Sequence, residues 1–125
     1  MAPKLVDPHP LKLVLDYART LTDVSVTEKT PHDRPDEFIR IEHTATRSTS
    51  PVTDKCDMLI QATAPTPGRA LELAEMLRRN LWDIDIYVME ILGWEELTGP
   101  VRHDDPSLPN SCRFQFTGAI FQALD

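Results

Sequence analysis

Segment 38–82 constrains the fold more than any other part of the chain, because each of its boundaries carries a physical signal. It begins with alternating apolar and polar residues, a pattern typical of a half-buried antiparallel strand. A polar stretch rich in Ser and Thr follows at 46–55, and we expect it to form a long hairpin tip. A second alternating run predicts the partner strand, whose inner face would carry Cys56, Met58, Ile60, Ala62 and Ala64.

The second strand ends at a sharp corner, Thr66-Pro67, which predicts the start of a helix. Thr is a good N-cap, because its hydroxyl can accept an otherwise unpaired backbone N–H of the first turn. Proline is favoured at the first helical position, where its missing N–H costs nothing. The apolar residues that follow form one stripe at helical spacing, which has to be buried against the neighbouring strands. They are Ala70, Leu73, Ala74, Leu77 and Leu81.

Periodicity and turn residues predict the other elements of the chain. These are a helix at 11–21, a short strand at 24–27, a loop at 28–36, strands at 86–92 and 111–124, and a loop between them at 93–110. Gly118 would mark a bulge in the last strand. The order α-β-β-β-α-β-β indicates an α+β fold, in which a mainly antiparallel sheet carries two helices on one face.

Length and charge narrow the function classes. The chain of 125 residues predicts one domain, 1–125, with a real hydrophobic core. Its net charge of −7 argues against general affinity for nucleic acids, because phosphate binding needs clustered cations. No apolar run is long enough to span a bilayer, and we expect no membrane partner. Cys56 and Cys112 are interpreted as buried thiols of a reducing cytoplasm, with a disulfide between neighbouring strands as the alternative.

Residues that could carry chemistry are sparse. The histidines, at 9, 32, 43 and 103, have none of the spacings that place metal ligands on one face. The only dense cluster is His103-Asp104-Asp105, which a small metal-dependent hydrolase could use as general base and metal ligand. The alternative, which we favour, is an exposed Pro/Asp turn. We therefore predict no enzyme activity and no cofactor, and a small-ligand module in a groove between helices and sheet is a further alternative.

Three parts of the chain match, in this order, the pattern of a known family. The first is Phe38-Ile39-Arg40-Ile41, a polar tip and Val52-Thr53-Asp54-Lys55. The second is the Ala-, Leu- and Arg-rich helix in 64–81, and the third is Gly99-Pro100, Asp105-Pro106 and the Arg-aromatic-x-Phe-Thr strand at 113–117. Together they resemble the tail terminator proteins of long-tailed (siphovirus-type) bacteriophages, especially those of actinobacterial hosts. The resemblance extends over about 11–120.

This resemblance implies a structural protein without catalytic residues. Such proteins form a ring, usually a hexamer, on the completed tail tube. The ring ends tube polymerisation and presents the head–tail joining surface, so its partners would be further copies of the chain, the tail tube protein and a head–tail connector protein. DNA would pass through the bore without specific binding. The protein would belong to the virion, at the head-proximal end of the tail, after assembly in the host cytoplasm. Another neck, connector or minor tail component is the alternative within phage assembly.

A ring requires two different patches on each subunit, and polar hairpins and loop ends are candidates for them. Basic groups there would pair with acidic groups of a neighbouring subunit or of the tube. For each residue taken alone, an ordinary solvated charge is the alternative. The candidate interface residues are Arg34, Arg47, Ser48, Thr49, Ser50, Pro51, Val52, Thr53, Lys55 and Arg113.

Overall fold

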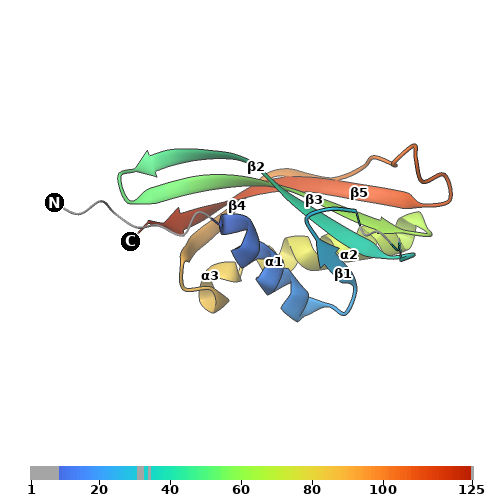
Figure 1. Ribbon diagram of the computed structural model, residues 1–125, viewed down its shortest axis with the longest axis horizontal. Coiled ribbons are helices and arrows are strands. Elements are labelled where there is room, and N and C mark those ends of the chain that lie inside the picture. Colours follow the sequence, from blue (N-terminus) through green and yellow to red (C-terminus); the bar gives the residue numbers. More distant parts are fainter. Residues whose placement is uncertain (1–8, 31–32, 34, 125) are drawn as a thin grey trace.

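A computed structural model describes residues 9–30, 33 and 35–124. A single five-stranded sheet carries the described helices on one face (Figure 1). This is the predicted α+β architecture and the predicted element order, with one additional short helix, α3. The elements are α1 (Pro10–Leu21), β1 (Ser25–Thr27), β2 (Phe38–Ser50), β3 (Thr53–Ala64), α2 (Pro67–Leu81), α3 (Ile84–Tyr87), β4 (Ile91–Arg102) and β5 (Cys112–Ala123).

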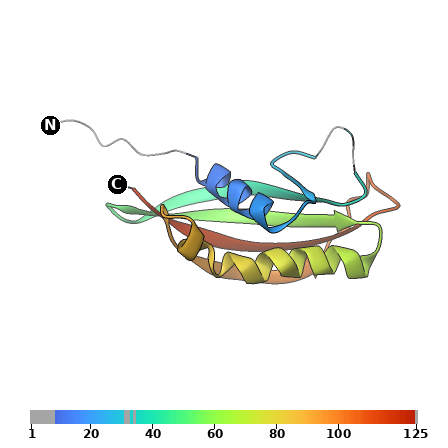
Figure 2. The same ribbon diagram turned by 90° about the horizontal axis from the view of Figure 1, so that it is seen from below.

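The strands are arranged in the order β1-β2-β3-β5-β4. Only the short β1 runs parallel to its neighbour, and the other three pairings are antiparallel. Helix α1 packs on β1 and β2, whereas α2 packs on β3, β5 and β4 (Figure 2). No described helix covers the opposite face of the sheet (Figure 1). None of the described helices has the length and apolar character needed to cross a membrane.

The corner before α2 forms as predicted. Thr66 is the N-cap in extended conformation, and its hydroxyl accepts the Arg69 backbone N–H at 3.3 Å. Pro67 occupies the first helical position. The predicted apolar stripe is buried in full, against the inner face of the sheet. Residues buried from that face include Ile39, Ile41, Cys56, Met58, Ile60, Ala62, Ala64, Phe116 and Ile120.

The predicted hairpin tip at 46–55 is wrong. Strand β2 continues to Ser50 and β3 begins at Thr53, so the turn consists of Pro51 and Val52 alone. Thr-rich sequence has good strand propensity. In addition, β5 pairs with β3 as far as Thr53, where its partner is Ala123, and this third strand supports the end of the hairpin.

The segment after α2 also differs from the prediction. Of the expected strand at 86–92, only Ile91 and Leu92 are strand, at the start of β4, and the rest is the end of α3 and a turn. Most of the expected loop at 93–110 also belongs to β4. A short apolar run cannot be assigned to helix or strand from periodicity alone. The Gly99-Pro100 pair suggested a loop, but it lies within β4, and an edge strand tolerates proline because one side of it carries no ladder hydrogen bonds.

The bulge predicted at Gly118 lies in the partner strand instead, because the extra residue is in β4, opposite Gly118 and Thr117. The register between β3 and β5 is continuous through Met58 and Gly118, and the irregularities lie in β4, including one between Glu96 and Thr98. Both cysteines are free. Cys56 is fully buried, but Cys112 is only partly buried and pairs with Ala64, at the other end of β3.

Candidate interface surfaces

The outer half of β2 presents a free strand edge. Strand β1 pairs only with positions 38–40 of β2, and no described strand pairs with the same edge from Ile41 to Ser50. Side chains from Thr44 to Thr49 are exposed on both faces of the sheet. The hairpin extends beyond the helices at one end of the molecule (Figure 1). Unpaired backbone N–H and C=O groups at such an edge can bind another strand.

Side-chain contacts within the hairpin hold most of its polar residues. Arg47 donates two hydrogen bonds to Asp57 across the strand pair, at 2.8 and 3.3 Å. The Asp57 carboxylate accordingly raises the pKa of Arg47. Further bonds run from Ser48 Oγ to Asp54 Oδ1 (3.3 Å), from Thr49 Oγ1 to the Thr53 carbonyl (3.3 Å) and from the Val52 N–H to Ser50 Oγ (3.2 Å).

Lys55 lies in the hairpin, but its side chain contacts residues of β4 and β5 in the same subunit. Its Nζ is 3.0 Å from a carboxylate oxygen of Glu95 on β4. The same ammonium lies 5.7 Å from the centroid of the Phe121 ring, which is within cation–π range. Only 17% of its side chain is exposed. Lys55 therefore ties β3 to its neighbours rather than presenting a free charge.

Arg113 lies at the opposite end of the sheet from the hairpin. It pairs with Thr63, whereas the hairpin end of β5 is Ala123, and ten residues of strand span roughly 33 Å. Its Nε donates to the His103 carbonyl at 2.8 Å, its Nη1 lies 3.6 Å from Asp105, and its side chain is 15% exposed. The structure thus separates Arg113 from the hairpin candidates. Arg34 lies outside the described residues.

The cluster His103-Asp104-Asp105 forms a turn held by arginines. Asp104 accepts from the Arg102 guanidinium at 3.1 Å and from the Arg113 backbone N–H at 3.0 Å. Both contacts, the first above all, hold the pKa of Asp104 below its usual range, which is unfavourable for a general base. Asp105 accepts the Ser107 backbone N–H at 2.9 Å, as in an Asp-initiated turn. Within the described residues, no three His, Cys, Asp or Glu side chains are grouped to hold a metal ion.

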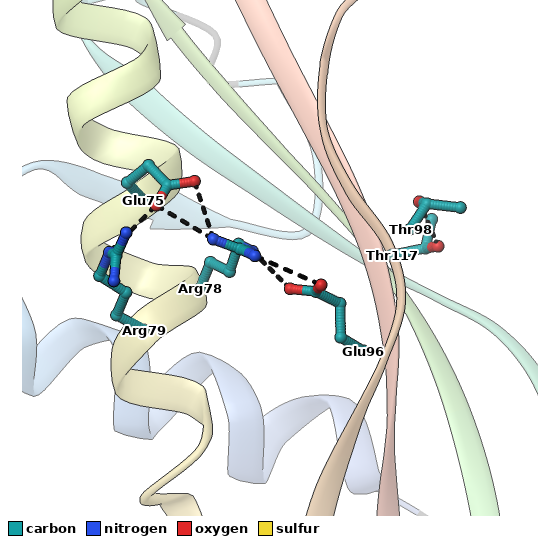
Figure 3. A network of polar contacts seen from close by, with 6 residues as sticks. All are labelled: Glu75, Arg78, Arg79, Glu96, Thr98 and Thr117. Atoms are coloured by element: carbon teal, nitrogen blue, oxygen red, sulfur yellow. Dashed lines mark hydrogen bonds and ion pairs between the residues drawn. The ribbon is translucent and has the colours of Figure 1, made fainter.

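An ion network links α2 to the edge strand β4 through Glu96, a contact that the sequence did not reveal. Arg78 makes a two-point contact with Glu96 and donates to both carboxylate oxygens of Glu75 at 3.1 Å (Figure 3). Glu75 also accepts from Arg79 at 3.0 Å. The side chains of Glu75, Arg78 and Glu96 are each about three-quarters buried, so the network fixes β4 against the helix layer.

Segment 82–92 forms a surface that the sequence reading assigned elsewhere. A strand was expected at 86–92, but the segment contains the end of α3, and most of the large apolar side chains in 82–92 are exposed. The two tryptophans differ in the same way, because Trp82 is exposed whereas Trp94 is buried in the core.

Comparisons with models of protein families and with curated proteins find no match for this chain.

Proposed function

We propose that this protein is a phage tail terminator, a structural protein that closes the tail tube as a ring and forms the joining surface for the head. One observation carries the proposal. The segments of the resemblance are distant in sequence but adjoin in the fold. Positions 38–41 of β2 and 113–117 of β5 flank the same stretch of β3, so that Arg40 and Gln115 both pair with Gln61.

Side chains reinforce this three-strand unit on the face away from the helices. Arg40 Nη1 donates to Gln61 Oε1 at 3.0 Å, and Gln61 Nε2 donates to Gln115 Oε1 at 3.1 Å. Helix α2, another segment of the resemblance, packs on the opposite face of β3 and β5. The pattern therefore corresponds to one packed unit of the fold, as expected if a common architecture underlies the resemblance.

The two ends of the sheet offer the different surfaces that a ring requires. One end carries the polar hairpin with its free edge, and the other carries the Arg113 turn with its ion pairs. Heterologous contacts between unlike patches generate closed rings when the rotation between subunits closes. In the proposed assembly, the hairpin provides the contact to the neighbouring subunit or to the tail tube protein. A head–tail connector protein would bind the other side of the ring.

The charge of the chain is compatible with passage of DNA. Each copy has a net charge of −7, and in the proposed ring part of this acidity would line the bore. Like charges repel DNA phosphates, so the bore would let DNA pass without specific binding. No catalytic residue or cofactor takes part in this function.

Deletion of the gene from its phage tests the proposal. Without a terminator, tube polymerisation continues, so electron microscopy should show overlong tails that are not attached to heads. Wild-type protein supplied in trans should restore tails of normal length. Tails of normal length that fail to join heads would contradict the proposal and would indicate a connector instead.

A further inference from the structure

An exposed apolar surface surrounds α3. Ile84 is fully buried and anchors the short helix, but large apolar side chains on both sides of it face solvent. Met89 is 92% exposed and Tyr87 is 72% exposed. Large apolar side chains that are exposed close together mark binding surfaces, whereas singly exposed apolar residues are normal on any protein surface. The α3 surface consists of Trp82, Ile86, Tyr87, Met89 and Leu92.

Within the stretch of chain that carries the α3 surface, every charged residue is acidic. Positions 80–101 contain five Asp and Glu residues and no Lys, Arg or His. Two of these acids, Glu95 and Glu96, pair with cations from other elements. The remaining three, Asp83, Asp85 and Glu90, form no ion pair with any residue that the structure describes. The apolar surface therefore lies beside three carboxylates that have no counter-charge among the described residues.

A groove between α1 and α3 adjoins this surface. It has a volume of about 480 Å³, and its lining is largely apolar, with Asp16 and Asp83 among the lining residues. The rings of Tyr17 and Tyr87 stack at 6.0 Å between centroids, and the Tyr17 hydroxyl donates to the Asn80 carbonyl at 2.6 Å. Burial, and next the Asp83 charge, raise the pKa of Tyr17, as expected for a carboxylate near the ring. An aromatic ring beside a carboxylate suits a Lys or Arg side chain.

We infer that the α3 surface binds a segment of another protein that combines Lys or Arg with apolar side chains. The cations would pair with Asp83 and Asp85 and lie against the Tyr87 ring, while the apolar side chains would cover Ile86 and Met89. This inference rests on the chemistry of the surface and stands independently of the proposed tail function.

Charge complementarity favours a basic, apolar protein segment over a second copy of the chain, a lipid surface or a nucleic acid. A second copy also carries a net charge of −7, and each of its described Lys and Arg residues except Lys29 already has an acidic partner within the chain. Anionic lipid surfaces and nucleic acids are repelled by the three unpaired carboxylates. A basic, apolar protein segment satisfies both properties of the surface.

A designed peptide provides the probe. An amphipathic helix of Leu and Lys, about 14 residues or four turns long, presents the inferred chemistry, and a Leu/Glu peptide of the same length is its counterpart. Trp82, at the surface, reports binding by its fluorescence, whereas Trp94 is buried. We expect a saturable blue shift with the Leu/Lys peptide that weakens as salt is added, and no shift with the Leu/Glu peptide or with anionic phospholipid vesicles.

Paired variants locate the binding. The double variant Asp83→Asn/Asp85→Asn should weaken binding of the Leu/Lys peptide about tenfold, which corresponds to about 1.4 kcal/mol of binding free energy. The matched control, Asp23→Asn/Asp36→Asn, removes the same charge from exposed sites elsewhere and should bind like the wild type. Equal effects of both variants, no saturable binding, or binding to the vesicles would overturn the inference.

Self-association provides a further test of the occupant. Sedimentation of wild-type protein and of Ile86→Ser/Met89→Ser distinguishes a second copy from a different partner, and both side chains are exposed, so the variant should fold. We expect the two proteins to have the same oligomeric state, with peptide binding lost in the variant. Self-association that is present in the wild type and lost in this variant would assign the surface to a second copy and overturn the inference.

Discussion

The indole ring of Trp94 occupies the space above Gly118, so that a Cβ atom on Gly118 would overlap the ring. The carbonyl oxygen of Glu95 lies only 2.7 Å from the same position. Trp94 also meets Phe116 edge-on, with ring centroids 6.5 Å apart. Glycine at position 118 therefore lets the edge strand bring a large side chain into the core between β4 and β5.

Substitution Gly118→Ala should destabilise the protein, because neither the ring nor the backbone carbonyl can give way without disturbing β4. We expect the free energy of unfolding to fall by about 1–3 kcal/mol, the usual range for an overpacked core, as measured by urea denaturation. The control is Gly68→Ala in the first turn of α2, where nothing lies within 4 Å of the added Cβ. That variant should be neutral or gain up to about 1 kcal/mol. Equal effects at both positions would contradict this account of Gly118.

Some elements could be predicted from the sequence because their signals are local. The Thr66-Pro67 corner and the stripe of α2 depend on neighbours in the chain, and both form as expected. The length of the hairpin depends on β5, because Thr53 pairs with Ala123, which is 70 residues further along the chain. Gly99-Pro100 fits into a strand because β4 lies at the sheet edge and its pairing with β5 is irregular between Thr98 and Val101. Local patterns do not contain such information.

The candidate surfaces show the same division. Sequence alone identified the hairpin residues as polar and accessible. It could not show that Lys55 and Arg113 are bound within the subunit, because their partners lie elsewhere in the chain, Glu95 on β4 and Asp105 in the turn after it. The α3 surface was missed because the apolar residues at 86–92 suggested a strand. The absence of any cation from positions 80–101 was the available signal.

Substitution Thr66→Ala should weaken the start of α2. It removes the hydroxyl that accepts the Arg69 N–H, and N-cap losses of this kind cost about 1 kcal/mol. Urea denaturation measures the change, and Thr66→Ser serves as the control, because serine keeps the accepting oxygen. If Ala and Ser were equally stable, the cap hydrogen bond would contribute nothing.

Arg78 and Arg79 offer a matched pair on one helix. The Arg78 side chain is about three-quarters buried between Glu75 and Glu96, whereas Arg79 is largely exposed and, among the described residues, forms an ion pair with Glu75 only. We expect Arg78→Met to cost about 1 kcal/mol and Arg79→Met less than about 0.5 kcal/mol. The difference should shrink in a Glu96→Gln background, which a double-mutant cycle by urea denaturation would detect. Additive effects of Arg78→Met and Glu96→Gln would contradict a direct interaction.

Stability should fall in acid. The pKa of Asp104 is lowered by Arg102 and the Arg113 N–H, and that of Glu37 by Arg69. A carboxyl whose pKa is lower in the folded state stabilises it above the ordinary pKa of about 4, and this contribution disappears as pH falls through the lowered value. Melting temperatures should therefore drop between about pH 5 and pH 2. The variant Asp104→Asn should be less stable than the wild type at pH 7 but closer to it at pH 2, and parallel curves would contradict the assignment.

A change at the hairpin apex should affect assembly without affecting folding. Pro51 and Val52 are exposed, so an insertion of two glycines between them should change the free energy of unfolding by less than about 1 kcal/mol. If the hairpin contacts the neighbouring subunit or the tube, the same insertion should abolish complementation of the deleted phage and leave tails overlong, as seen by electron microscopy. An equal insertion between Glu28 and Lys29, two exposed residues after β1, is the control and should complement normally. Full complementation by the apex variant would exclude the hairpin from the assembly contacts, because a longer and more mobile apex cannot preserve a close protein contact at that position.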